Sequence, residues 1–479
     1  MTVKLLGSSD AIGGDTFVTA AVDQIALTAP LGEDSLPGLC EIERAASVDL
    51  VVSYAPHCVR DQSQAPDSLA SAAQLRRLAA IRARPGIGFP AAVHLERCAA
   101  PARVVVTDSP SMAMLGGIGS LVLVAEPHQL VDAIASGHFR IPTPKVLQVS
   151  LSGRLCPSVS ARDVVLELLR LGLSERVREL AHPDSCPVIL EFSGPGMRSM
   201  AVSERALLCS AAQQVGAAAA LAACDERTDN FLRDQRRSKA YRQLAPDPGA
   251  PCSDALCLDL MTVVPMVALG NGQIVPASET AAMPIREVVI GGEATATLRD
   301  LLNAAVWFKT KRICPDVDVV LVPSSHQVFE TIAADGTLAQ LLSVGARLLE
   351  ADSRLSTGEW QPPPPDGLSL RSYFCQQASG QFPNWAVASL DTLCMSAIAG
   401  TIQDPRAARK IPKVSLPREL PIDDSILFDK KPTVVTTMLP PPRSSCPAPP
   451  LEAGTEESKS RVQDPHCGTT ELHLDGPPG

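Results

Sequence analysis

Cysteines are the residues in this chain most able to bind a metal or carry out redox chemistry, and there are fourteen of them. Thiolates are soft ligands that suit zinc, copper and iron–sulfur clusters. Structural zinc sites usually contain a short CxxC turn, and no such turn occurs here. The closest pair, Cys252 and Cys257, lies in a Pro/Asp-rich segment. We interpret the cysteines as reduced thiols, since their scattered spacing does not resemble a disulfide framework.

Two further motifs could suggest catalysis, and neither has the required context. The SSHQ segment at Ser324–Gln327 lacks the strand and sharp turn of a nucleophile elbow. It predicts the start of a helix, with a serine as the N-cap. The GGIG segment at Gly116–Gly119 lacks the GxGxxG spacing and the following acidic residue of a dinucleotide site. It predicts a close-packing turn.

Composition excludes several classes of partner. The net charge of −10 and the pI near 5.4 do not favour nucleic-acid binding, which needs clustered Lys and Arg. The basic run 233–242 sits beside acidic residues and is typical of a solvated helix face. No segment has the length of uninterrupted apolar sequence that a membrane helix needs. We expect a soluble, cytoplasmic protein with no membrane or nucleic-acid partner.

Alternating apolar segments and helical patterns define the fold class. Strands are predicted at 104–107, 145–149, 188–192, 287–290 and 317–322. Helices are predicted at 163–171 and 207–220, the second rich in Ala. Strands that alternate with helices indicate α/β layers around buried sheets. The Pro-rich segment 429–479 has too little apolar sequence for a core and is predicted to be disordered.

Several segments, in order, resemble the aconitase and 3-isopropylmalate dehydratase large-subunit family. They are VVVTDSPSMAMLGGIGSLVLV (104–124), IPTPKVLQVSLSGRLCPSVSARDVVLELL (141–169), ILEFSGPGMRSMAVSERALLCSAAQQVGA (189–217), CDERT (224–228), GQIVPAS (272–278), VASLDTLCMSAIAGTIQDPR (387–406) and PIDDSILF (421–428). Each segment alone is weak. Their order over about 420 residues identifies the chain as a member of that family.

The resemblance implies a three-layer α/β fold with three related domains around a central cleft. The expected domains are 1–185, 186–283 and 284–428. We expect this chain to lack the family's fourth, swivelling domain, which a separate chain provides in the two-subunit enzymes. The resemblance therefore implies a small-subunit-like partner chain or an active large-subunit homologue as a partner.

Family members are hydro-lyases that use a 4Fe–4S cluster held by three thiolates. At the matching positions this chain has Glu293, Asp352 and Leu355. Because carboxylates and aliphatic side chains cannot replace thiolates as cluster ligands, we expect no cofactor. As an alternative, Glu293 and Asp352 could hold a divalent metal such as Mg²⁺ or Mn²⁺. The simpler interpretation is that both are solvated loop acids.

The resemblance also places other residues in the cleft. Asp108 and Ser109 remain from an Asp-Ser-His-Thr turn, but Pro110 replaces its histidine. His94 matches a family histidine, although a structural histidine is at least as good an interpretation. Gln376 and Gln381 stand where the family has two arginines that grip the substrate, and glutamine lacks the bidentate fork that binds carboxylates.

These substitutions lead to three hypotheses. The first is a pseudoenzyme: a degenerate homologue without conventional hydro-lyase activity that binds a small organic acid or a partner subunit. On this hypothesis no residue is assigned a catalytic role. The second is a cluster-free hydro-lyase or isomerase that acts on a hydroxy di- or tricarboxylic acid, with carboxylates as acid and base. The third is an unrelated function on the same fold.

Overall fold

The computed structural model describes residues 1–7, 17–29, 31, 36–42, 48–54, 73–75, 77–183, 185–280, 282–376, 382–412, 414–417, 419–430 and 432. The described residues belong to one compact unit, Met1–Arg443. The predicted disordered tail, apart from its first few residues, lies outside the described residues, as does Gln381. Within the described part, no helix is long and apolar enough to cross a membrane.

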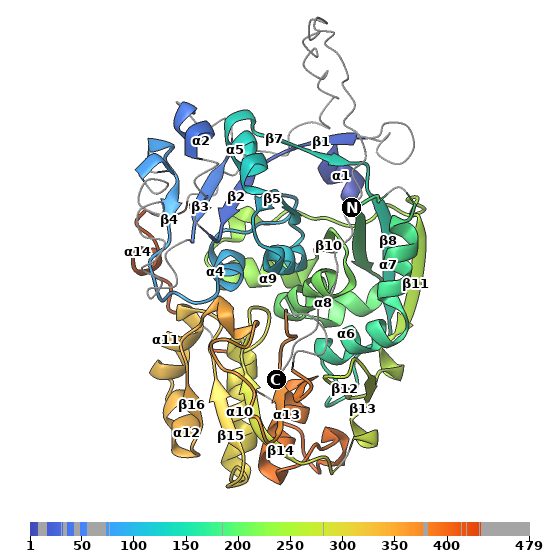
Figure 1. Cartoon of the computed structure of the whole chain (residues 1–479), viewed down its shortest axis with the longest axis vertical. Coiled ribbons are helices and arrows are strands. Elements are labelled where there is room, and N and C mark those ends of the chain that lie inside the picture. The colour runs from blue at the N-terminus through green and yellow to red at the C-terminus, as the bar shows by residue number, and fades with distance from the viewer. Residues whose placement is uncertain are drawn as a thin grey trace, which may run out of the picture. The chain divides into compact units, whose positions relative to one another are not determined.

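Short apolar segments of the first third form a parallel sheet (Figure 1). Its order is β4-β3-β2-β5-β6, with the bounds β2 (Gln24–Leu27), β3 (Leu50–Ser53), β4 (Ile81–Arg82), β5 (Val104–Thr107) and β6 (Leu121–Val124). Every residue of β2, β3 and β5 is buried. Such strands are expected where helices and loops cover both faces of a parallel sheet. A separate antiparallel pair joins β1 (Phe17–Ala21) to β7 (His138–Pro142).

A second parallel sheet has the order β10-β9-β8-β11. Its strands are β8 (Lys145–Ser152), β9 (Val188–Ser193), β10 (Ala219–Ala222) and β11 (Asp254–Asp259). The third sheet has the order β13-β12-β18-β17-β14-β15-β16, in which β12 pairs antiparallel with β13 and β18 and the remaining pairs are parallel. Its strands are β12 (Met266–Ala268), β13 (Ile274–Pro276), β14 (Ile285–Ile290), β15 (Asp318–Leu321), β16 (Arg347–Leu348), β17 (Leu368–Arg371) and β18 (Trp385–Ala388).

Helices connect and cover these strands. The α-helices are α1 (Thr2–Leu6), α2 (Leu36–Glu41), α4 (Pro90–Arg97), α5 (Pro127–Ser136), α6 (Ala161–Arg170), α7 (Leu173–Ala181), α8 (Val202–Val215), α9 (Glu226–Asp234), α10 (Leu298–Thr310), α11 (His326–Ala334), α12 (Thr337–Ser343), α13 (Leu390–Ala399) and α14 (Asp424–Leu427). The 3-10 helices are η4 (Pro110–Ile118), η5 (Pro195–Ser199), η6 (Ser238–Ala240), η7 (Leu260–Thr262), η8 (Ala277–Glu279), η9 (Ser353–Leu355) and η10 (Pro405–Ala407).

The α/β prediction is confirmed, and most predicted elements lie within a few residues of the observed ones. The predicted strand 104–107 matches β5, and Ser325 caps α11 by accepting a hydrogen bond from the Val328 N–H. The helix predicted at 207–220 is wrong at its end. Helix α8 stops at Gly216, whose φ of +73° suits glycine, and Ala219–Ala222 is a fully buried strand. The basic run 233–242 also differs from its prediction, because α9 ends at Asp234 and a turn follows.

The predicted domain boundaries fall inside or beside shared sheets. The 185/186 boundary separates β8 from β9, which are neighbours in the second sheet. The 283/284 boundary separates β12 and β13 from the other five strands of the third sheet. Apolar cores also join the sheets: Ile189 and Leu221 pack into the core of the first sheet, and Phe89 packs against residues of the third. The three-domain division therefore stays a prediction.

The helix η4, between β5 and β6 of the first sheet, lies very close to elements of the second sheet. A Cβ atom added to Gly117 would overlap the backbone of Ala206 in α8, and one added to Gly116 would overlap the carbonyl of Ala220 in β10. Glycine at these positions thus lets η4 lie directly against two backbone segments. The predicted role of the GGIG segment as a close-packing turn agrees with this geometry.

We predict that Gly117→Ala lowers the free energy of unfolding by about 2 to 3 kcal/mol, because the new methyl group must push backbone segments apart. Chemical denaturation of the purified variant measures the change. The matched control is Gly38→Ala in α2. Its new Cβ would lie 3.4 Å from Val131 Cγ1 of α5, which is an ordinary van der Waals contact. Equal stability of the two variants would contradict the proposed close packing.

Candidate ligand-binding cleft

The turn between β14 and α10 carries Glu293 at the carboxyl end of a parallel strand. β14 ends at Ile290, Gly291 and Gly292 follow, and Thr297 caps α10. Gly292 has φ +98°, and a Cβ atom there would lie 2.8 Å from Tyr373 Cβ. The glycine therefore allows the tight turn that directs the chain past Tyr373. Ligands commonly bind at the carboxyl ends of strands in open α/β sheets.

Glu293 lies beside the first turn of η4 (Pro110–Ile118), which is far from it in the sequence. A hydrogen bond links its carboxyl group to the side chain of Ser111. Ser111 Oγ also lies 2.9 Å from Ser109 Oγ, so the two serine hydroxyl groups are hydrogen-bonded to each other. Burial raises the pKa of Glu293 to about 7, and the Ser111 hydrogen bond opposes this only in part. Near neutral pH this carboxyl group can therefore both accept and donate a proton.

Arg162, in the first turn of α6, brings a positive charge to the same region. The side chain is 5% exposed, and its guanidinium carbon lies 5.1 Å from the ring centroid of Phe374. Within the described residues its guanidinium has no ion pair, and Nε has no hydrogen-bond partner. Burial lowers the pKa of Arg162 to about 10, which still leaves it cationic at neutral pH. An unpaired buried cation is unusual in a folded protein.

The acid beside Arg162 does not neutralise it by an ion pair. Asp163 Oδ2 accepts the Ser160 N–H at 2.8 Å, and Oδ1 accepts the Met266 N–H at 2.9 Å. Asp163 is fully buried, and burial raises its pKa to about 7. Its carboxyl group thus caps α6 and joins that helix to β12. The Arg162 guanidinium is left to face the cavity.

One cavity of about 60 Å³ brings these groups together. Its lining consists of Phe89, Ser111, Met114, Arg162, Ser210, Gln213, Gln214, Gly292, Glu293, Ala294, Thr295, Leu355, Ser356, Tyr373, Phe374 and Gln376. The side-chain oxygen Oε1 of Gln214 is also buried without a hydrogen-bond partner among the described residues. A water molecule occupies about 30 Å³ in the liquid, so this volume suits roughly two waters or one carboxylate group. We call this set of residues the Glu293 cleft.

The predicted residues Asp108 and Ser109 lie beside the cleft. Asp108 accepts hydrogen bonds from Thr28 N at 2.8 Å, Thr28 Oγ1 at 2.9 Å and Ala29 N at 2.8 Å. Its carboxylate therefore holds the loop after β2 in place. Ser109 reaches the cleft only through its hydrogen bond with Ser111.

His94 lies inside α4 and not in the Glu293 cleft. Its Nδ1 is 3.0 Å from Tyr54 Oη, and its Nε2 is 3.0 Å from Gln24 Oε1. The side chain is fully buried, and burial lowers its pKa to about 3. His94 is therefore a neutral imidazole with a partner for each nitrogen. This agrees with the interpretation of His94 as a structural histidine.

The remaining predicted residues are divided between the cleft and its surroundings. Gln376 lines the cleft and is exposed. Asp352 is buried but outside the lining, and both its oxygens bind Arg354, with Oδ2 to Nη2 at 2.6 Å and Oδ1 to Nε at 3.0 Å. Glu293 and Asp352 therefore do not converge on one point. Leu355, the third expected ligand position, does line the cleft.

Comparison with known proteins gives a consistent result. The Aconitase family (aconitate hydratase) model matches residues 57–281. The 3-isopropylmalate dehydratase large subunit 2 of Archaeoglobus fulgidus is 28% identical over 409 residues, covering 83% of this chain and 96% of that protein. The large subunit 1 of Thermotoga maritima is 26% identical over 329 residues, covering 67% and 77%. Mitochondrial homoaconitase of Cryptococcus neoformans is 25% identical over 300 residues, covering 56% and 40%.

These matches support the aconitase and 3-isopropylmalate dehydratase large-subunit family for this chain. Its relatives indicate an aconitase-family hydro-lyase. The predicted resemblance is thereby confirmed over most of the chain, including segments on both sides of the Glu293 cleft.

The prediction that this family member needs no cofactor is wrong. Its aconitase-family relatives indicate use of a 4Fe–4S cluster. The predicted ligand positions do not fit such a cluster, because Glu293, Asp352 and Leu355 carry no thiol and Asp352 binds Arg354 outside the cleft lining. These three positions therefore do not show which residues would provide the thiolate ligands of the cluster. The alternative prediction of a divalent metal in place of the cluster is wrong for the same reason. In the described ranges, no group of three or more His, Cys, Asp or Glu side chains is suited to a metal ion.

Arg162 is the cleft residue that the sequence analysis missed. It lies in the SARDV segment used for the resemblance, but the resemblance directed attention to lost ligands and arginines. The available signal was a basic residue two positions after Ser160, a residue type that commonly caps helices. Cations are disfavoured in the first turn of a helix, so such a residue suggests a specific role.

We predict that Glu293→Gln stabilises the folded protein at pH 8 but not at pH 4.5. A carboxyl group whose pKa is raised from 4.5 to about 7 on folding binds its proton more tightly in the folded chain. Ionisation therefore destabilises the fold progressively as pH rises through this interval, by roughly 3 kcal/mol when it is complete. Chemical denaturation of the variant and the unmodified protein at both pH values measures the difference.

The control for this prediction is Glu359→Gln, which changes an exposed carboxylate in the bend after η9. It should alter stability equally little at both pH values. A pH-independent effect of Glu293→Gln would show that this carboxyl group titrates normally and would contradict the burial argument.

Proposed function

We propose that the chain binds a small organic acid in the Glu293 cleft and lacks conventional hydro-lyase activity. The observation that carries this proposal is the buried, unpaired Arg162 in the cleft lining. A carboxylate is the natural partner of a guanidinium, since two parallel N–H groups match its two oxygens. The cavity volume suits one carboxylate group, with the rest of the acid extending toward exposed Gln376.

Other groups in the cleft support binding of a hydroxy acid. Ser111 offers a hydroxyl group, and Gln214 Oε1 is an acceptor without a partner within the described residues. A substrate hydroxyl group could satisfy that acceptor. Protonated Glu293 could donate to a second carboxylate, and ionised Glu293 would repel it. We therefore expect acid binding to weaken as pH rises through about 7.

The positions of the two family arginines support the absence of conventional activity. Gln376 replaces one of them at the cleft and cannot form a charged fork with a carboxylate. Arg162 provides charge from a different element, so a bound acid would be held differently. Binding without the family's geometry does not place the reacting bonds for catalysis.

We further propose a small-subunit-like partner chain. The relatives in Archaeoglobus fulgidus and Thermotoga maritima are named as large subunits. A partner chain would cover the exposed side of the cleft, next to Gln376. The cytoplasmic location stays a prediction.

We predict that Arg162→Gln weakens the binding of malate by about tenfold or more, because it removes the cationic partner of the carboxylate. Isothermal titration calorimetry of the full chain at pH 6 measures the affinity. Arg162→Lys should retain part of it, since the charge remains while the fork is lost. Arg178→Gln, at an exposed site in α7, is the control and should bind like the unmodified protein.

Two results would overturn the binding proposal. One is the absence of saturable malate and 3-isopropylmalate binding, and the other is an unchanged affinity in Arg162→Gln. Thermal unfolding of each variant separates a folding defect from a binding defect. The substitution to lysine keeps the test valid if the glutamine variant does not fold.

The second candidate is hydro-lyase activity itself, favoured by the relatives' names and by the pKa of Glu293 near 7. Anaerobic reconstitution with iron and sulfide, followed by metal analysis and an assay of 3-isopropylmalate dehydration with and without a small subunit, distinguishes the two. Turnover that depends on Glu293 would replace the binding proposal with this one. Malate binding without turnover in the reconstituted protein would support the first.

A further inference from the structure

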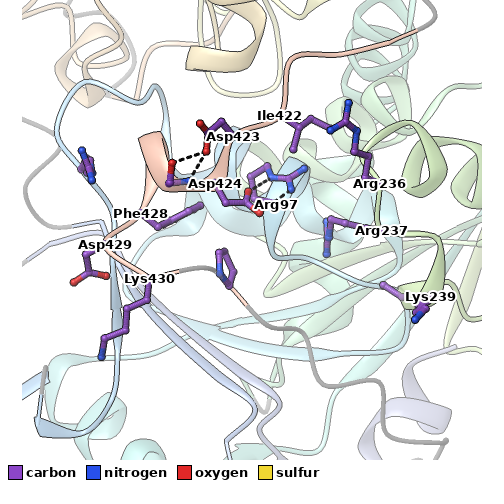
Figure 2. A pocket seen from close by; sticks show the side chains of 14 residues that line it. Arg97, Arg236, Arg237, Lys239, Ile422, Asp423, Asp424, Phe428, Asp429 and Lys430 are labelled. Carbon is purple, nitrogen blue, oxygen red and sulfur yellow. Dashed lines mark hydrogen bonds and ion pairs between the residues drawn. The ribbon is translucent and has the colours of Figure 1, made fainter.

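A larger cavity lies away from the Glu293 cleft, between α4, the turn after α9 and the segment that contains α14. Its volume is about 610 Å³. Figure 2 shows Arg236, Arg237 and Lys239 on the segment after α9, with Asp429 and Lys430 on the other side. We call it the arginine cavity. Pockets of this volume commonly hold ligands of nucleotide or drug size.

The lining of the arginine cavity is cationic in a chain whose net charge is −10. Six Arg and Lys side chains line it, against three Asp side chains. The basic members are Arg84, Arg97, Arg236, Arg237, Lys239 and Lys430. When all are ionised, the lining has a net charge of +3. This local excess opposes the overall charge of the protein and attracts anions.

The aspartates are already committed to other groups. Asp424 Oδ1 accepts from Arg97 Nε at 2.7 Å, and this pair is almost fully buried. Asp429 accepts the Arg82 N–H at 2.8 Å. Asp423 caps α14 through the Ser425 N–H at 2.9 Å and the Ser425 hydroxyl group at 2.6 Å. These contacts leave most of the cations without a carboxylate partner.

Two arginines form a fixed floor, while others remain available. Arg237 donates to the carbonyls of Glu96 at 3.0 Å and of Ala99, where α4 ends. Burial lowers its pKa to about 10, so it keeps its charge at neutral pH. Arg97 also donates from Nη1 to the Gln235 carbonyl at 3.1 Å. Arg84, Arg236, Lys239 and Lys430 are exposed, and the described residues give their side chains no ion pair.

We propose that the arginine cavity binds a small molecule that carries a diphosphate or triphosphate group. Arginine forks and lysine ammonium groups on opposing walls match several phosphate oxygens at once. A lining charge of +3 balances a ligand with about that many negative charges. Ile422, which is half-buried, adds apolar surface for the remainder of such a molecule.

The test is isothermal titration calorimetry, in which inorganic pyrophosphate is titrated into the full chain in low-salt buffer. We expect saturable binding at one site. The double variant Arg236→Ala/Lys239→Ala should bind about tenfold or more weakly, because it removes two available cations from one wall. Both side chains are exposed, so the variant should keep its unfolding temperature. Arg286→Ala, an exposed arginine of β14, is the control and should leave binding unchanged.

Three outcomes would overturn the proposal. The absence of saturable pyrophosphate binding would show that the cavity is not a phosphate site. An unchanged affinity in the double variant would place the binding elsewhere. Citrate binding that is as tight as that of pyrophosphate and equally weakened in the double variant would show that charge alone is recognised and would refute the choice of phosphate.

Discussion

The fold depends on the direct contact between η4 and two backbone segments of the second sheet. Gly116 faces the Ala220 carbonyl and Gly117 faces Ala206, with no room for a side chain at either position. Because η4 begins at Pro110, this contact also fixes Ser111 where it meets Glu293 from the third sheet. A packing constraint in the apolar interior thus sets the position of a polar group about two helical turns away. The Glu293 cleft exists because elements from three sheets are held against one another at short range.

The strands were predictable because the chemistry that specifies them is local. A run such as Val104–Thr107 is apolar throughout, and a strand covered on both faces needs no more than that. The end of α8 was not predictable on the same basis, since Ala217–Ala222 is rich in a strong helix former. Burial of β10 beside β9 outweighs that propensity, and Gly216 provides the left-handed residue that ends the helix. Tertiary contacts of this kind cannot be read from a window of neighbouring residues.

The candidate cleft was predictable only in part. Glu293 followed from its place after an apolar strand and a glycine pair, but its partner Ser111 lies 182 positions earlier in the chain. Asp352 looked equally available in the sequence, yet Arg354, two residues later, occupies its carboxylate. His94 was also a predicted cleft residue, and both its nitrogens have partners, Tyr54 and Gln24, in the region of the first sheet. The sequence identifies residue types, whereas the fold determines which of them have unused hydrogen-bonding capacity.

Arg162 shows why unused capacity is informative. A buried cation without a partner costs several kcal/mol, and its position in the first turn of α6 adds the unfavourable interaction with the helix dipole. The charges of Asp163 and Asp300 offset part of that cost, but backbone N–H groups hold the Asp163 carboxyl group, and it forms no ion pair with Arg162. The Phe374 ring recovers a smaller part through its contact with the guanidinium. A carboxylate ligand would remove most of the cost, so binding of an acid would stabilise the folded chain through the very residue that otherwise strains it.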